Sequence, residues 1–324
     1  MRTRLTEMLG IQHPIVLGGM AGATVPEMVA AVSNAGGLGI LGASRNGPGG
    51  IARLAEALRA RTDRFGLNLL LFAATSEEVD AAIAQRPAVL STAWPWPDQH
   101  LRPIFDRAHG MGVPVMHMVS TVAEAERAAS AGADVIVAQG TEGGGHVGLI
   151  GTMVFVPMVV RAVAPIPVVA AGGIATGAQL AAALVLGAEG AVLGTRFLAT
   201  HESPWPDSFK RALVESDGHD TELTEIPDIA KGNVWPGAFD RARRNRLIAE
   251  WAGREHELRR RRADVAQSIA RARADGDADH GELNFGQAAG LIGSIDSCAA
   301  VVRRLTTDAE QALATRLPIP DNGV

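Results

Sequence analysis

The chain has 324 residues and a net charge of −5, and it is 47% hydrophobic and 20% charged. This charge gives no general attraction to nucleic acid, and the apolar runs are too short and too broken to cross a membrane. A single cysteine, Cys298, excludes an intramolecular disulfide framework, and the amino terminus lacks the apolar stretch of a signal peptide. These totals predict a soluble, cytoplasmic protein without a nucleic-acid or membrane partner.

A repeating unit occupies residues 14 to about 209: a short apolar run, a turn and an alanine-rich helical pattern. Strands and helices that alternate at this spacing indicate βαβ units, which right-handed crossovers join into a parallel sheet. Eight units favour closure into a (β/α)8 TIM barrel over an open sheet. The predicted strands are residues 15–17, 38–41, 65–69, 88–91, 115–118, 134–138, 168–171 and 191–194.

The character of the chain changes after residue 208. Residues 222–236 have no clear period, whereas residues 239–274 are rich in Arg, Ala and Glu and predict one or two long helices. A last helix is expected at about 297–314. We therefore divide this α/β protein into a barrel of residues 1–209 and a helical lid or flanking segment of residues 210–324 that packs on the barrel.

The loop after the predicted sixth strand, residues 139–148, contains five glycines and one histidine. Glycine buries no side chain and loses the most entropy on ordering, so such a loop usually lets backbone approach a ligand closely. We expect the loop to hold a flat cofactor and His146 to face the substrate above it. Glu142 either orients His146 or is solvated, and the sequence leaves both open.

Two further glycine loops end the predicted seventh and eighth strands. The first contains Gly172 and Gly173, and the second contains Gly194 followed by Thr195. In barrels, the loops at these two positions commonly supply backbone N–H groups for a phosphate dianion. Their presence together predicts a phosphate site.

The first and third strands suggest a site for a planar ring. Gly18 and Gly19 end the first strand and precede Met20, and Asn68 is a polar residue in an otherwise apolar strand. A buried amide needs partners, which the edge of an isoalloxazine ring offers. The sequence has no Walker A motif, no G-x-G-x-x-G after the first strand and no paired Cys/His spacing for a metal. One phosphate site beside one ring site favours flavin mononucleotide, FMN, over a dinucleotide or a metal.

Other residues near the predicted rim have two interpretations each. Trp94 and Trp96, after the fourth strand, either wall a substrate pocket or pack against a neighbouring loop. His117 either reaches the barrel mouth or is a buried histidine with satisfied hydrogen bonds. Ser120 and Thr121, after the fifth strand, are expected to cap the following helix and not to bind substrate, and Cys298 is expected to be inert within a helix.

Together these motifs resemble those of the nitronate monooxygenases, formerly called 2-nitropropane dioxygenases, over about residues 12–202 and 284–312. The resemblance implies an FMN enzyme that uses O2 to oxidise alkyl nitronates, with nitroalkanes as further candidates, to a carbonyl compound and nitrite. It gives His146 the role of catalytic base or hydrogen-bond donor to the substrate anion. The motifs that carry it are residues 18–20, 31–39, 68, 139–148, 170–174, 187–190, 194–197 and 286–290, and the positions assigned to FMN are Gly18, Gly19, Met20, Asn68, Gln139, Gly145, Ala171, Gly172, Gly173, Gly194 and Thr195.

Related enzymes share the histidine loop. FMN-containing enoyl-acyl-carrier-protein reductases and NADH:quinone reductases have it too, so an FMN-dependent NAD(P)H reductase of a quinone or an enoyl thioester is the alternative. A non-catalytic flavin- or phosphate-binding barrel is the second alternative. Residues 210–283 contain no tyrosine and leave the family's aromatic substrate contacts without a counterpart. A homo-oligomer is compatible with the sequence, which does not fix the oligomeric state.

Overall fold

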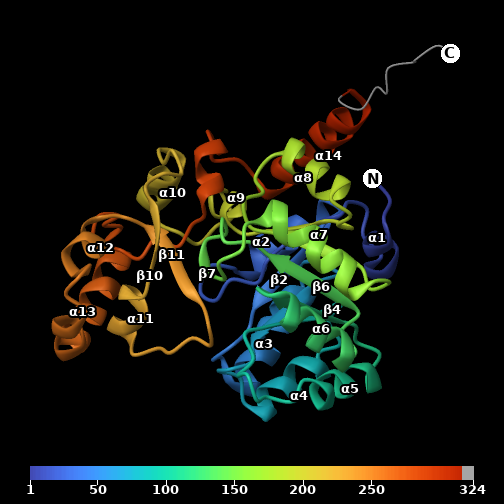
Figure 1. Cartoon of the computed structure of the whole chain (residues 1–324), viewed down its shortest axis with the longest axis horizontal. Coiled ribbons are helices and arrows are strands. Elements are labelled where there is room, and N and C mark those ends of the chain that lie inside the picture. Colours follow the sequence, from blue (N-terminus) through green and yellow to red (C-terminus); the bar gives the residue numbers. More distant parts are fainter. Residues whose placement is uncertain (316–324) are drawn as a thin grey trace.

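The computed structural model describes residues 1–315 and contains a closed barrel of eight parallel strands (Figure 1). The strands follow one another around the barrel in chain order, which is the arrangement that right-handed βαβ units produce. All eight predicted strands are confirmed. They are β1 (Ile15–Leu17), β2 (Leu38–Gly42), β3 (Gly66–Leu70), β4 (Val89–Ala93), β5 (Val115–Val119), β6 (Val135–Gln139), β8 (Val168–Ala171) and β9 (Ala191–Leu193).

Helices surround the barrel, and α4 (Ser76–Ala84), α6 (Val122–Ala131) and α8 (Gly177–Val185) begin at side-chain caps. Thr75, Thr121 and Thr176 each accept a hydrogen bond from the backbone of the first helical turn and form a capping box with the residue three positions on. The predicted cap at Thr121 is thus confirmed. The helices that follow the strands are α2 (Pro26–Asn34), α3 (Gly47–Arg59), α4 (Ser76–Ala84), α5 (Arg102–Gly110), α6 (Val122–Ala131), α7 (Thr152–Val163), α8 (Gly177–Val185) and α9 (Thr195–Leu198).

The strands are apolar on both faces, as burial on both sides requires. Residues such as Val16, Ile40 and Val137 form one cluster inside the barrel, which also contains Leu5 and Leu9 of α1 (Arg4–Leu9). Leu5 lies beside Gly190, just before β9, so α1 closes the amino-terminal end of the barrel. The glycine loops lie at the opposite, carboxyl-terminal end of the barrel.

Residues between α10 (Asp207–Val214) and residue 283 form an insert with both helices and strands. β10 (Thr221–Thr224), β11 (Phe239–Arg243) and β7 (Gly145–Val147) make a second sheet, with β11 antiparallel to both neighbours. The expectation of helix from residue 239 is wrong for β11, because pairing with two neighbouring strands outweighs local preference there. The helices of the insert are α11 (Ile226–Lys231), α12 (Arg246–Trp251) and α13 (Glu255–Asp275).

The carboxyl-terminal segment returns to the barrel through the 3-10 helix η1 (Gln287–Leu291) and α14 (Cys298–Thr315), which agrees with the predicted last helix. Helix α14 packs against α8 (Figure 1). A Cβ atom on Gly177 would lie 2.4 Å from Cβ of Asp308, so only glycine permits this close approach. Within residues 1–315, no helix is both long and apolar enough to span a membrane.

Candidate active site

The histidine loop is built into the second sheet. His146 on β7 lies directly opposite Asp240 on β11, and Gly145 lies opposite Arg241. Arg241 Nε also donates to the carbonyl oxygen of Thr141, at 2.8 Å. These contacts attach the loop to the insert, so the insert fixes the position of His146 (Figure 1).

The His146 ring has a carboxylate partner. Its Nε2 atom lies 2.8 Å from Oδ2 of Asp228 on α11, and the two side chains are 12% and 11% exposed. An ionised carboxylate only accepts hydrogen bonds, so this partner assigns the hydrogen to Nε2 and leaves the lone pair on Nδ1. The arrangement suits a base, because Asp228 stabilises the imidazolium that forms when Nδ1 takes a proton.

Aromatic side chains crowd one face of the same ring. Trp235 stacks on His146 with ring centroids 3.4 Å apart and an interplanar angle of 11°. Trp235 also contacts Phe72, at 4.6 Å between centroids, and Trp94, at 6.2 Å. Trp96 packs edge-on against Phe72. The two tryptophans of the predicted rim therefore pack against neighbouring loops and, in doing so, join an aromatic cluster of Phe72, Trp94, Trp96 and Trp235 beside His146.

Asp240 is a second acid next to His146. It is fully buried, and neither carboxylate oxygen has a hydrogen-bond partner among residues 1–315. Burial raises the pKa of Asp240 well above its ordinary value, and Glu282 and Asp228 raise it further, while Lys231 lowers it only in part. Of the two acids beside His146, Asp240 thus keeps its proton to a higher pH than an ordinary aspartate, and Asp228 is the one that bonds to the imidazole.

The glycine loops meet at the carboxyl-terminal end of the barrel. Gly172 and Gly173 both have left-handed backbone conformations, with φ of 89° and 71°. A Cβ atom on Gly172 would lie 2.6 Å from the Gly140 carbonyl oxygen, so the loops after β6 and β8 touch. The same two segments also share a backbone hydrogen bond, which the Gly140 N–H donates to the Ala171 carbonyl oxygen at 2.9 Å.

The remaining predicted contacts lie at the same end. A Cβ atom on Gly19 would lie 2.4 Å from Cβ of Asn68, and one on Gly194 would lie 3.1 Å from Sδ of Met20. The ends of β1, β3 and β9 are therefore in contact as well. Gly18 completes this group by donating its N–H to the Leu193 carbonyl oxygen at 3.0 Å.

The polar groups at these loops fit the edge of a flavin ring. Oε1 of Gln139 is buried and has no partner among residues 1–315, so it can accept a hydrogen bond from a ring N–H. The space that a Cβ on Gly145 would enter holds no atom within 4 Å. Asn68 donates to Oγ of Ser91 and Thr195 accepts from the Gly286 N–H, so both are already oriented by the protein.

Other sequence-based expectations have clear outcomes. Glu142 neither orients His146 nor is merely solvated, because it accepts hydrogen bonds from the N–H and hydroxyl of Thr152. His117 lies outside the barrel interior with Nδ1 2.8 Å from Oγ1 of Thr92, and burial lowers its pKa to about 3. Burial raises the pKa of Cys298 to about 12, which agrees with an inert thiol.

Sequence reasoning missed Asp228, Trp235 and Asp240. Asp228 and Trp235 lie in the part of the insert without a clear period, and Asp240 lies in a stretch whose composition predicts a helix. Only the long-range pairing of β7 with β11 brings the insert to His146. The sequence of the insert is rich in charged residues, and such a composition does not identify a site. Their roles follow from the fold.

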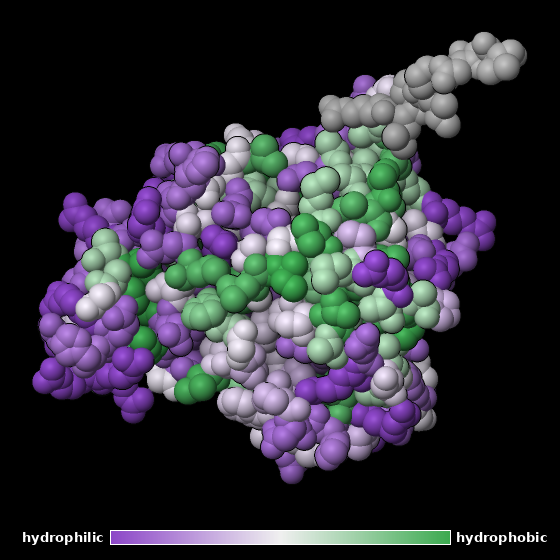
Figure 2. All heavy atoms as spheres, in the orientation of Figure 1, coloured by the Kyte–Doolittle hydropathy of each residue, from purple (hydrophilic) through white to green (hydrophobic). Residues whose placement is uncertain are grey.

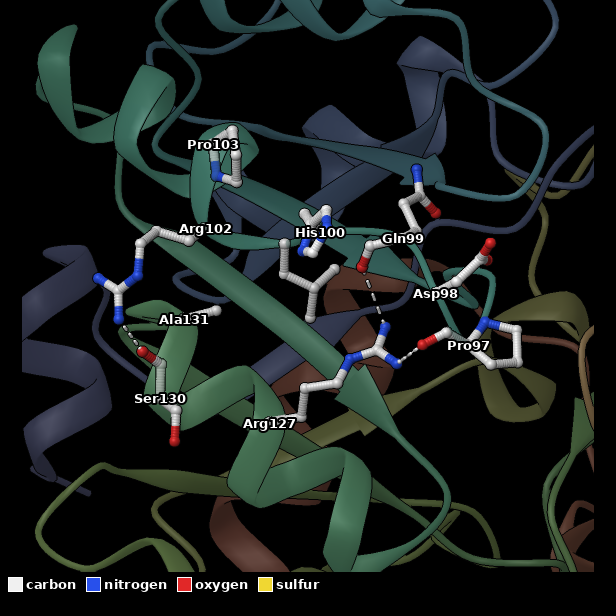
Figure 3. Close-up of a pocket in the computed structure, with 10 residues that line it drawn as sticks. Pro97, Asp98, Gln99, His100, Arg102, Pro103, Arg127, Ser130 and Ala131 are labelled. Atoms are coloured by element: carbon white, nitrogen blue, oxygen red, sulfur yellow. Dashed lines mark hydrogen bonds between the residues drawn. The ribbon is translucent and has the colours of Figure 1, made fainter.

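A separate cavity of about 620 Å³ lies beside α5 and α6, away from the glycine loops (Figure 3). Its arginines are engaged by backbone carbonyl groups: Arg127 donates to Pro97 at 2.8 Å and also to Trp96, and Arg102 donates to Ser130. Both arginines of this cavity are therefore held by the backbone, and Asp98 and His100 are its other polar residues that can carry a charge. Arg127 holds the loop that carries Trp96.

A closed parallel barrel, with glycine loops and a His–Asp pair at its carboxyl-terminal end, defines a TIM-barrel enzyme. The chain belongs to the nitronate monooxygenase family, whose model matches residues 2–101 and 77–308. The family and its named members are oxidoreductases, so this protein is one as well, and membership implies a flavin cofactor.

Individual relatives span different activities. The chain is 33% identical, over 97% of its length and 98% of the other, to the (3aS,4S,5R,7aS)-5-hydroxy-7a-methyl-1-oxo-octahydro-1H-indene-4-carboxyl-CoA dehydrogenase of Mycobacterium tuberculosis. It is 32% identical to a probable nitronate monooxygenase of Staphylococcus aureus, with 79% and 82% of the two chains covered. The structure of FabK from Thermotoga maritima matches with a TM-score of 0.86 and 33% identity, over 97% and 98% of the two chains.

Proposed function

We propose that this protein is an FMN-dependent nitronate monooxygenase, which uses O2 to oxidise alkyl nitronates to a carbonyl compound and nitrite. The observation that carries the proposal is the His146–Asp228 pair beside the glycine loops. A nitronate is an anion with two oxygens, and a protonated His146 held by Asp228 is a matching donor. Membership of the nitronate monooxygenase family supports the same reaction.

In this proposal, FMN binds at the carboxyl-terminal end of the barrel and supplies the redox chemistry. The unpaired Oε1 of Gln139 and the open space at Gly145 favour a ring edge at the histidine loop. The left-handed glycines after β8 and the residues after β9 suit a phosphate. The chain would hold the cofactor with Gly18, Gly19, Met20, Asn68, Gln139, Gly145, Ala171, Gly172, Gly173, Gly194 and Thr195.

The protein's own contribution is to orient the substrate and to handle its proton. A nitronate, already deprotonated, needs only a donor for its oxygens. A neutral nitroalkane must first lose its α-proton, which Nδ1 of His146 is free to accept because Nε2 is bonded to Asp228. Asp228 then stabilises the resulting imidazolium.

Replacing His146 by Asn tests this role directly. Reduction of the bound flavin by a nitroalkane, followed by absorbance without oxygen, should slow by roughly 10²–10⁴-fold, because positioned general bases contribute about that much. Reduction by preformed propyl nitronate should slow less. His109→Asn is the matched control, since His109 Nε2 also lies 2.8 Å from Oδ2 of an aspartate, Asp134, but away from the site. Unchanged rates with both substrates in His146→Asn would remove His146 from the mechanism.

A second candidate is oxidoreduction of a coenzyme A thioester, alone or with NAD(P)H. It is supported by the match to the M. tuberculosis CoA dehydrogenase, which covers nearly all of both chains. The same His–Asp pair could remove or deliver a proton next to a thioester carbonyl. Flavin bleaching by NADH or by an acyl-CoA, without response to nitronate, would favour this candidate over the first.

A further inference from the structure

Trp235 belongs to a short strap, residues 232–238, that joins α11 to β11 and runs towards the barrel (Figure 1). Gly232 and Gly237 flank its centre, and both have left-handed conformations, with φ of 70° and 73°. Within residues 1–315, no backbone hydrogen bond holds residues 234–238. The strap therefore has a glycine near each end and no backbone hydrogen bond in the described chain that holds its middle.

The Trp235 indole occupies a position among aromatic rings beside the base, which we call the aromatic slot. The His146 imidazole stacks on it at 3.4 Å, Phe72 packs against it at 4.6 Å, and Trp94 meets it edge-on. Its Nε1 atom is buried without a hydrogen-bond partner in the described chain, and an unpaired buried donor costs free energy. Stacking, and not its polar group, holds this ring in place.

The barrel rim that receives the strap is strained. Trp94 and Arg45, which follow β4 and β2, have φ of 52° and 65° although neither is glycine. Trp94 contacts the indole, and Arg45 Nη2 donates to Oδ1 of Asn233 in the strap at 3.2 Å. Residues held in such conformations concentrate at ligand clamps and switch regions.

The surface around the strap is apolar. Val234 in the strap, Leu149 after β7 and Phe239 at the start of β11 are 70%, 68% and 39% exposed. Figure 2 shows apolar side chains gathered over the middle of the face where the insert meets the barrel. These side chains leave apolar surface exposed on and beside the insert.

We propose that Trp235 stands in the place of a planar aromatic group of the substrate, and that the strap swings about Gly232 and Gly237 to admit that group between His146 and Phe72. This inference rests on the proposed function and narrows its substrate to aryl-substituted nitronates, such as that of phenylnitromethane. A short aliphatic nitronate has no ring to replace the stacking that the indole loses. It would bind with Trp235 still in the slot or with an empty space beside His146.

The test is ligand binding to the flavin-loaded protein, followed by 19F NMR after labelling its five tryptophans with 5-fluorotryptophan. Phenylacetate and butyrate are the probes, because both are inert carboxylate anions and only one has a ring. Phenylacetate should shift the Trp235 resonance, assigned through Trp235→Phe, and should bind about tenfold more tightly than butyrate, as one aromatic contact allows. The Trp205 and Trp251 resonances should stay in place.

The variant Trp235→Ala distinguishes two roles of the indole: a stand-in that occupies the place of the ligand ring, and a platform on which the ligand ring stacks. A stand-in competes with the ligand, so its removal should tighten phenylacetate binding several-fold. A platform stacks on the ligand, so its removal should weaken binding and would overturn the proposal. Trp96→Ala is the control, since Trp96 contacts Phe72 from outside the slot and is 39% exposed.

If Trp235→Ala does not fold, the titration of the wild-type protein is sufficient to test the proposal. An unmoved Trp235 resonance at saturating phenylacetate, or equal affinity for butyrate, would refute the aromatic slot. Binding needs no turnover, so the two proposals can fail separately. If the protein binds phenylacetate as expected but oxidises neither propyl nor phenylmethyl nitronate, the aromatic slot is supported and the proposed function is refuted.

Discussion

His146 owes its chemical character to residues distant in the chain. Asp228, its hydrogen-bond partner, is 82 positions away, and Asp240 lies opposite it in the sheet. The two acids have different surroundings, because Asp240 is fully buried without a hydrogen-bond partner in the described chain, which raises its pKa, whereas Asp228 bonds to the imidazole. Two similar side chains thus lie in different electrostatic environments beside the same histidine.

Replacing Asp228 by Asn should reverse the tautomer of His146. The asparagine amide can donate to Nε2, which moves the ring hydrogen to Nδ1 and removes the lone pair that we propose takes the substrate proton. We expect turnover of a nitroalkane to fall by roughly 10²–10⁴-fold and that of a preformed nitronate by much less. Rates with both substrates over a range of pH measure this difference. Equal losses with the two substrates would assign Asp228 a role in binding only.

Replacing Asp240 by Asn should stabilise the protein at pH 7. Its pKa is raised in the folded state, so the unfolded chain gives up this proton at a lower pH than the folded chain does. The contribution of Asp240 is complete below the unfolded pKa of about 4 and is lost as pH rises towards the folded value. Asparagine is neutral throughout, so urea unfolding should show a gain at pH 7 that disappears near pH 4.

Asp296 provides the opposite case. The Ser294 hydroxyl and then Arg304 lower its pKa, so its contribution is present above the unfolded pKa and lost as pH falls. Asp296→Asn should therefore reduce stability at pH 7. A loss of stability in Asp240→Asn at pH 7 would mean that Asp240 is ionised in the folded protein.

At the scale of elements, local pattern predicted the barrel and missed the second sheet. Each barrel strand is a compact apolar run followed by an alanine-rich helix, so its sequence alone carries the signal. β11 is Phe-Asp-Arg-Ala-Arg, without a β-branched residue, and it becomes a strand only because β7 and β10 pair with it. For the same reason the glycine loops and His146 could be predicted, whereas Asp228, Asp240 and Trp235 could not.

The packing of α14 on α8 gives a test at this scale. Gly177→Ala would place a Cβ 2.4 Å from Asp308, against the backbone of α14, and should destabilise the protein by about 1–3 kcal/mol in urea unfolding. Gly49→Ala in α3 is the control. Its nearest neighbour would be the flexible end of Arg53 at 3.6 Å, so it should be neutral or stabilise by up to about 1 kcal/mol. Equal effects of the two changes would contradict the close approach.

At the scale of the whole molecule, two parts of the chain share the site. The barrel supplies the glycine loops and His146, and the insert supplies Asp228 and the strap with Trp235. This chain belongs to the nitronate monooxygenase family and is also similar, over 97% of its length, to a CoA dehydrogenase.

The most direct test is an anaerobic titration of the purified protein, followed by its absorbance. We expect a yellow protein with an FMN spectrum that NADH leaves unchanged and that propyl nitronate, or more effectively phenylmethyl nitronate, alters at once. Admission of oxygen should restore the oxidised spectrum and release nitrite. A colourless protein would contradict the flavin site, and a spectrum bleached by NADH but indifferent to both nitronates would contradict the proposed reaction.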